Sequence, residues 1–146
     1  MKPYPHVYQV RAQGSASGAV RVSSADLPDV QTAPPPEFGG PGAVWSPETL
    51  LVASIAECFI LTFRGVARAA HLEWDSLDAQ VEGTLERMAG VTQFTRYATR
   101  AILTVKPNAD HAKARELLER AEKICLVANS LRGERLLDAT VNTSAA

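Results

Sequence analysis

The first third of the chain alternates weakly between apolar and polar positions. Residues 4–13 and 19–22 are expected to form two strands across a glycine- and serine-rich break, which is typical of a hairpin. A third short strand is expected at 30–32. The prolines at 34–36 cannot donate ladder hydrogen bonds, and glycines follow them up to Gly42, so this segment is expected to form a shaped loop.

A long apolar segment follows and predicts a helix over about 50–70. Ser46 can cap the open amides, Pro47 fits the first helical position, and Glu48 lies near the positive end of the helix dipole. Apolar or small residues then occupy nearly all sides of the helix, which implies burial on most faces. Since a chain of 146 residues can hardly cover so long a helix by itself, the pattern implies a partner subunit.

Alternation returns in the second half of the chain. Two long strands are expected at 77–88 and 92–105, joined through Ala89 and Gly90. Apolar residues at helical spacing then predict a second helix over 110–126, opened by Asn108 or Asp110 as its cap.

A short helical piece near 127–131 and a last strand near 137–141 complete the predicted elements. Three strands, a long helix, two strands, a helix and a strand indicate the α+β class, with antiparallel sheet and helices on one face. The length of 146 residues is that of one domain, so 1–146 is expected to be a single domain.

Composition narrows the range of partners. A formal net charge of -1 provides no broad field for a polyanion, so nucleic acid is not expected as a partner and the substrate is expected to be small. Residues 1–6 lack the apolar core of a secretory signal, and no run is expected to reach the roughly 18 apolar residues that span a bilayer. These features favour a cytoplasmic protein with no membrane partner.

The candidates for chemistry are the two cysteines, Cys58 and Cys125. In a reducing compartment, free or redox-active thiols are more common than structural disulfides. Neither cysteine belongs to a CxxC pair and the three histidines lack ligand spacing, so no metal site is expected. Each cysteine could also be a small buried core residue, and its position in the sequence does not decide between these interpretations.

The spacing of these residues limits how they can meet. Glu48 precedes Cys58 by ten residues (58 minus 48), so the two can face the same side of one helix about 15 Å apart, too far for direct contact. Glu48 could equally be a carboxylate that stabilises the start of the helix. Cys125 follows Cys58 by 67 residues (125 minus 58), so only the fold could bring the two sulfurs together. If it does, a peroxide-oxidised sulfenic acid can condense with the second thiol.

The residues around Cys58 form a specific combination. A glycine-rich run at 39–42 is followed by Ser-Pro-Glu-Thr-Leu at 46–50 and by Cys-Phe at 58–59. This combination resembles the signature of the OsmC/Ohr family, the osmotically inducible and organic hydroperoxide resistance proteins, in which the reactive cysteine lies on such a helix. Cys125 falls where that family keeps its second cysteine. The resemblance covers nearly the whole chain, including the order of the predicted elements.

The resemblance implies an OsmC-like fold in an intertwined homodimer, with two active sites at the subunit interface. It assigns Cys58 as the peroxidatic thiolate, Cys125 as the resolving thiol and Glu48 as the carboxylate that orients an arginine beside the sulfur. No bound cofactor is expected, because an external dithiol or lipoyl-type reductant would return the electrons. An apolar pocket would favour alkyl or fatty-acid hydroperoxides over hydrogen peroxide. The residues expected to line that pocket are Phe38, Trp45 and Phe59.

Two positions depart from the family pattern. Where the family has its arginine, this chain has Ala16 and Pro36, and the nearest substitute is Arg21, which could also be a solvated strand residue. Cys125 is followed by Leu126 instead of proline, a change that could move this sulfur. The expected function is thiol-dependent reduction of organic hydroperoxides. The alternative is a small-molecule-binding or stress protein of the same fold that lacks peroxidase chemistry.

Overall fold

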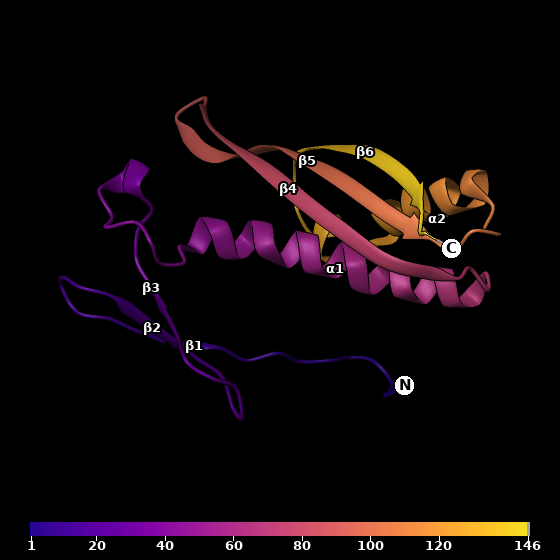
Figure 1. Ribbon diagram of the computed structural model, residues 1–146. Helices are drawn as coiled ribbons and strands as arrows, with labels where there is room; N and C mark the ends of the chain where they lie inside the picture. The colour runs from indigo at the N-terminus through magenta and orange to yellow at the C-terminus, as the bar shows by residue number, and fades with distance from the viewer. Residues whose placement is uncertain (146) are drawn as a thin grey trace. The chain divides into compact units, whose positions relative to one another are not determined.

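The computed structural model describes residues 1–145, and the chain divides into two compact units, 1–51 and the residues from Val52 onward. Strands and helices occur in both units in the order shown in Figure 1, so the expected α+β class is confirmed. The assignment of 1–146 to a single domain stays a prediction. Each unit is described by itself below.

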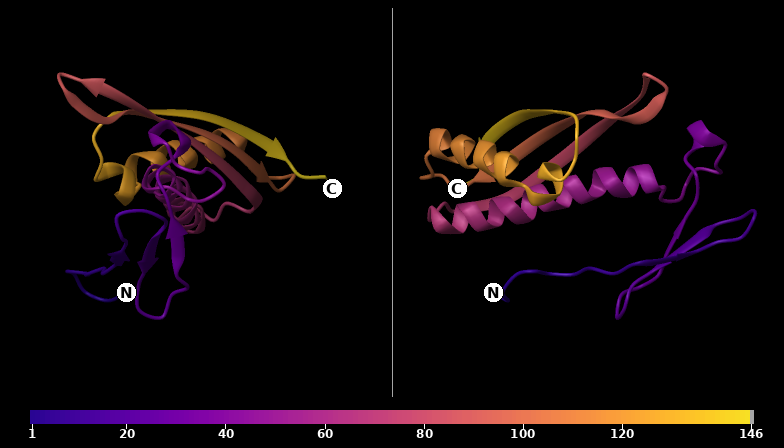
Figure 2. Two further views of the ribbon diagram at one scale, coloured as in Figure 1. Left: turned by 90° about the vertical axis from the view of Figure 1, so that its left-hand side faces the viewer. Right: turned by 180° about the vertical axis from the view of Figure 1, so that it is seen from behind.

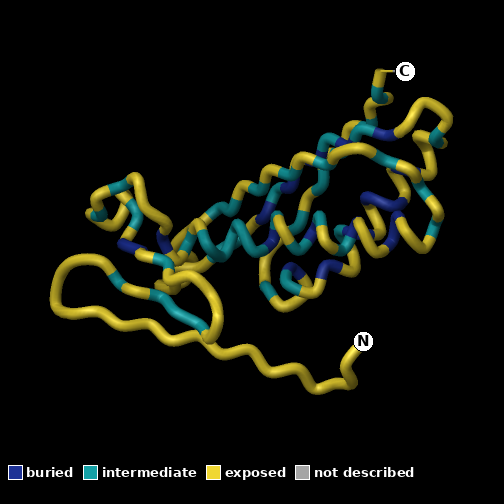
Figure 3. The backbone as a smooth tube through the Cα atoms, turned by 60° about the horizontal axis from the view of Figure 1, so that its bottom comes forward, coloured by how far each residue is buried: buried dark blue, intermediate teal, exposed yellow. Residues whose placement is uncertain are grey.

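The first unit holds a small antiparallel sheet. Its strands, β1 (Arg11–Gln13), β2 (Val20–Ser23) and β3 (Val30–Thr32), pair in the order β1-β2-β3, so the expected hairpin and third strand are confirmed. The first strand is shorter than the alternation of 4–13 suggested. All of residues 1–19 are exposed, as the yellow trace in Figure 3 shows, so a longer strand would bury no apolar face.

The segment after β3 is the shaped loop that its prolines and glycines predict. A short 3-10 helix, η1 (Pro36–Phe38), forms within it, and the Ala33 amide donates to the Trp45 carbonyl across 3.0 Å to close the loop. A Cβ atom on Gly40 would lie 1.5 Å from the Pro34 carbonyl oxygen. Only glycine therefore fits at position 40 without moving the backbone.

Helix α1 (Pro47–Ala69) begins where the sequence predicts it. The Ser46 hydroxyl accepts a hydrogen bond from the Thr49 amide across 3.1 Å, and the Thr49 hydroxyl accepts one from the Ser46 amide across 2.9 Å, so two open amides are satisfied reciprocally. Pro47 occupies the first helical position, where its missing N–H costs no helical hydrogen bond.

Helix α1 is longer and more apolar than the sequence analysis expected of any segment. With 23 residues it is long and apolar enough to cross a membrane by length and composition, so the expectation that no run reaches that length is wrong. Charged residues inside the helix are few and widely spaced, so its mean hydropathy stays high across Glu57 and Arg64. The core helix of a soluble protein meets the same criterion, and α1 has such a buried stripe. Its buried residues are Ile55, Phe59, Phe63, Val66 and Ala67.

The second unit contains a sheet with the order β4-β5-β6. Strands β4 (Trp74–Met88) and β5 (Val91–Val105) form the expected hairpin through Ala89 and Gly90, whose positive φ angles of 49° and 82° suit a tight turn between twisted strands.

Strand β6 (Glu134–Thr143) runs parallel to β5, so the second sheet is mixed and the expectation of antiparallel sheets throughout is wrong. The reason lies in the connection. Helices α2 (His111–Ile124) and α3 (Leu126–Asn129) carry the chain back along the sheet, so β6 starts from the same end as β5.

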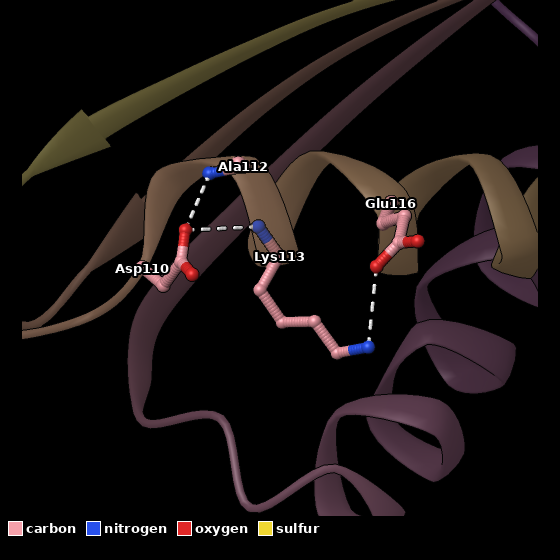
Figure 4. A network of polar contacts seen from close by, with 4 residues as sticks. All are labelled: Asp110, Ala112, Lys113 and Glu116. Atoms are coloured by element: carbon pink, nitrogen blue, oxygen red, sulfur yellow. Dashed lines mark hydrogen bonds and ion pairs between the residues drawn. The ribbon is translucent and has the colours of Figure 1, made fainter.

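Helix α2 is capped by Asp110, one of the two residues expected for that role. Its carboxylate accepts hydrogen bonds from the amides of Ala112 (2.8 Å) and Lys113 (3.1 Å), and Lys113 also pairs with Glu116 one turn later across 3.2 Å (Figure 4). These contacts fix the start of the helix that leads to Cys125.

The core of the second unit lies between the sheet and its helices. From Val52 onward α1 covers the same face of the sheet as α2, which the two views of Figure 2 show. Buried side chains of α1, β5 and α2 pack against one another there, because the apolar faces of these elements point toward each other. The members of this core are Phe59, Phe63, Val66, Ala67, Ala101, Leu103, Val105, Ala114, Leu117, Leu118 and Ala121.

Candidate functional site

The thiols of Cys58 and Cys125 lie beside each other in a second, smaller cluster of the same unit. Cys58 is partly buried on α1, and Cys125, with 1% of its surface exposed, stands at the junction of α2 and α3. The two side chains are close enough that Cys58 acts on the ionisation of Cys125 by hydrogen bonding and by charge. The fold thus brings together two sulfurs that are far apart in the sequence, and both are free thiols.

The helix repeat directs Cys58 toward the cluster. Cys58 is three residues after the buried Ile55, so both side chains emerge on the same face of α1. Its sulfur lies 3.9 Å from the hydroxyl of Thr62, one turn further along. Val81 and Phe94 of the hairpin pack against the same cluster, so the surroundings of Cys58 are largely apolar apart from the Thr62 hydroxyl and the Cys125 thiol.

Several effects act on the ionisation of Cys125, and their net result raises its pKa. Burial is the largest cause, because it penalises the charged form. The backbone amides of Ala128 and Val127 face the sulfur and partly oppose this effect, although neither completes a capping hydrogen bond. The neighbouring Cys58 raises the pKa further. Cys125 is therefore held as a protonated thiol.

A small cleft of about 10 Å³ opens beside Cys125, enough for one water molecule. Its polar wall is formed by Glu122 and Arg135, whose carboxylate oxygen and Nε lie 2.6 Å apart. Tyr97 lines the same cleft, and burial raises the pKa of its hydroxyl. The cleft is lined by Ile55, Phe59, Tyr97, Thr99, Glu122, Cys125, Ala128 and Arg135.

Glu122 and Arg135 were not predicted from the sequence. Arg135 occupies an inward-facing position of β6, in step with Leu137, Ala139 and Val141, where alternation favours an apolar residue. A charge at such a position requires a partner, and Glu122 is one helical turn before Cys125. This break in the alternation is the signal that could have identified the pair.

The two charged residues predicted for the site both lie in the first unit. Glu48 is in the first turn of α1, and its buried Oε2 has no hydrogen-bond partner within residues 1–145. The Arg21 Nε lies 2.5 Å from the Asp29 carboxylate, in an ion pair about half exposed to solvent. The roles of Glu48 and Arg21 toward Cys58 stay predictions.

The three residues predicted for a substrate pocket differ in burial. Phe59 is 2% exposed and lines the cleft beside Cys125. Phe38 and Trp45 belong to the first unit and expose 57% and 53% of their surfaces. Exposed aromatic rings are available for contact with an apolar ligand, and their part in a substrate pocket stays a prediction.

Comparison with known proteins identifies the family. The family model described as OsmC-like protein matches residues 40–137, a range that contains Glu48, Cys58 and Cys125. The chain belongs to the OsmC-like protein family. This OsmC-like chain is 30% identical over 112 residues to the protein YmaD of Bacillus subtilis. The matched region covers 73% of this chain and 75% of YmaD.

Two further OsmC-like relatives extend the comparison. The organic hydroperoxide resistance protein of Xanthomonas axonopodis pv. citri is 31% identical over 127 residues, covering 84% of each chain. A solved OsmC-like protein from Vibrio cholerae matches with a TM-score of 0.83 at 17% identity, covering 93% of this chain and 100% of that one. At that identity the solved structure establishes the OsmC-like fold and nothing about activity.

Proposed function

We propose that this OsmC-like protein is a cysteine-based peroxidase that reduces organic hydroperoxides, with Cys58 as the attacking sulfur and Cys125 as the resolving sulfur. The observation that carries the proposal is the packing of these two free thiols against each other from separate elements of the fold. Membership of a family that includes a named organic hydroperoxide resistance protein supports the choice of substrate class.

The first step transfers one oxygen atom. The Cys58 thiolate attacks the outer oxygen of a hydroperoxide, so an S–O bond forms while the O–O bond breaks, and the alkoxide that leaves takes up a proton to become an alcohol. The sulfur loses two electrons and becomes a sulfenic acid. A cation near the sulfur would stabilise the charge that develops on the leaving oxygen, which is the role proposed for Arg21, oriented by Glu48.

The second step joins the two sulfurs. Cys125 attacks the Cys58 sulfenic acid, an S–S bond forms as the S–O bond breaks, and the leaving hydroxide takes the Cys125 proton to become water. The raised pKa of Cys125 means that it enters this step as a thiol, so its proton must pass to the departing hydroxide as the S–S bond forms. An external dithiol or lipoyl-type reductant then returns both thiols by disulfide exchange, so no bound cofactor is needed.

The proposal includes a homodimer in the cytoplasm. Supporting it, α1 carries apolar residues beyond its buried stripe, among them the exposed Leu61. A second copy of the chain would cover this surface, and the reactive thiols would remain reduced in the cytoplasm. Phe38, Trp45 and Phe59 are proposed as the apolar contacts of an alkyl hydroperoxide.

Peroxide consumption tests the proposal. Purified protein supplied with tert-butyl hydroperoxide and dihydrolipoamide should consume the peroxide catalytically, and Cys58→Ser should abolish consumption. Cys125→Ser is the matched control: its Cys58 should still form a sulfenic acid that dimedone traps, with no intramolecular disulfide following. Normal turnover in the Cys58→Ser variant excludes Cys58 as the nucleophile.

One observation favours the alternative, an OsmC-like binding or stress protein without peroxidase chemistry. The Arg21 guanidinium is paired with the Asp29 carboxylate. The cation proposed to act beside the Cys58 sulfur therefore already has another partner. Alkylation separates the two functions. In the peroxidase, Cys58 should react rapidly with iodoacetamide already near neutral pH, whereas in the binding protein the reaction should become rapid only in alkaline solution.

A further inference from the structure

The side chain of Arg135 is bound at both sides of the segment that carries Cys125. Its Nε pairs with the Glu122 carboxylate across 2.6 Å and a terminal nitrogen donates to the Glu122 backbone carbonyl. The other terminal nitrogen donates to the side-chain oxygen of Asn129 across 2.5 Å. Glu122 belongs to the last turn of α2 and Asn129 ends α3, so one guanidinium connects the two helices that flank the sulfur.

Helical hydrogen bonds stabilise the backbone between these two helices only weakly. Cys125 has φ -59° and ψ 109°, a non-helical conformation that interrupts the helical path. The Cys125 amide reaches the Glu122 carbonyl across only a long 3.4 Å contact. Arg135 supplies the same carbonyl with a second, charged donor, so it stabilises the junction at the point where the backbone contact is weakest.

We propose that Arg135 is a positioning residue that holds the α2–α3 junction so that the Cys125 sulfur faces Cys58. The inference rests on the proposed peroxidase function and assigns Arg135 to its second step alone. Arg135 touches neither peroxide nor Cys58 in this role. It acts through Glu122 and Asn129, which fix the direction of the Cys125 side chain.

The geometry of the junction shows how the role of Arg135 could be replaced. Leu126 is exposed and is the first residue of α3, the position at which proline fits a helix. The ψ of 109° at Cys125 is outside the helical region and close to the range that a following proline favours. Leu126→Pro should therefore stiffen the same backbone without any contribution from position 135.

A single-turnover experiment tests this role. The full-length protein is mixed with one equivalent of tert-butyl hydroperoxide, and Cys58 oxidation and disulfide formation are followed separately by dimedone trapping and mass spectrometry. In Arg135→Met, Cys58 oxidation should stay within twofold of wild type, while disulfide formation should slow by about tenfold or more, because small misplacements of a reacting group are costly. Adding Leu126→Pro should restore most of the lost rate.

Two further variants test whether a general loss of stability, instead of a misplaced Cys125, explains the slower disulfide formation. Arg135→Lys keeps a positive charge opposite Glu122 but cannot span the carbonyl and Asn129 together, so it should fold and still form the disulfide slowly. Arg115→Met is the matched control, since Arg115 also donates to a backbone carbonyl, that of Ala139, and should leave both steps unchanged.

The outcomes distinguish the two proposals. Disulfide formation within twofold of wild type in both Arg135 variants, or an equal slowing of both steps that Leu126→Pro does not reverse, overturns the positioning role. Failure of wild-type Cys58 to react with the hydroperoxide overturns the proposed function instead. In that event diamide, which oxidises the thiol pair directly, replaces the peroxide, and the Arg135 variants are judged by the same disulfide rates.

Discussion

At the residue scale, burial and the neighbouring Cys58 together determine how firmly Cys125 holds its proton. Burial raises the pKa of Cys125, and the hydrogen bond and charge of Cys58 raise it further. Replacing Cys58 by alanine removes the second contribution and leaves the first. The pKa of Cys125 should therefore fall in Cys58→Ala, yet remain above that of an exposed cysteine.

The titration can be followed by the ¹³Cβ chemical shift of Cys125 in wild type and in the variant. Thr62→Val is the matched control, because Thr62 contacts Cys58 and should leave the Cys125 titration nearly unchanged. An unchanged or higher pKa in Cys58→Ala would show that the two thiols do not interact in solution.

The sequence identified both cysteines but not the residues that support Cys125. Local spacing relates residues within one helix or strand, whereas Cys58 and Cys125 meet only after β4, β5 and α2 have folded between them. The partnership of Arg135 with Glu122 is equally non-local, so it cannot be derived from the pattern of either element alone.

At the scale of elements, the start of α2 depends on a single carboxylate. Asp110→Ala leaves the amides of Ala112 and Lys113 without their acceptor and should lower the free energy of unfolding by about 1 kcal/mol. Asp110→Asn should lose much less, because its amide oxygen can accept the same bonds. Urea denaturation of the three proteins measures the difference, and equal losses in both variants would assign the effect to charge instead of capping.

The helices and the long hairpin were predictable because their signals are local. Ser46 and Pro47 mark the start of α1, and Ala89 with Gly90 marks the turn between β4 and β5. The direction of β6 was not predictable in the same way. It depends on how α2 and α3 cross the sheet, and alternation along a strand is the same whichever way its neighbour runs.

At the scale of the whole molecule, the apolar helix α1 leads to a prediction about assembly. Sedimentation velocity should find the wild-type protein as a dimer. Leu61→Glu should weaken association by at least about tenfold, because it would place an unpaired charge in an apolar contact.

A surface position outside α1 provides the control for that measurement. Met88 is also exposed, at the tip of the β4–β5 hairpin, and Met88→Glu should leave the association constant unchanged. A monomeric wild type, or equal effects of the two glutamates, would contradict a dimer built on this helix.

The adjacency of the two thiols also couples oxidation to thermal resistance. A covalent bond between them would join residues 67 positions apart (125 minus 58) and close a ring that includes the hairpin and α2. Closing so large a ring restricts the denatured ensemble and raises stability by about 4 kcal/mol in the chain-entropy description. The disulfide form would then resist heat and proteases better than the form with two free thiols, until a reductant cleaves the disulfide.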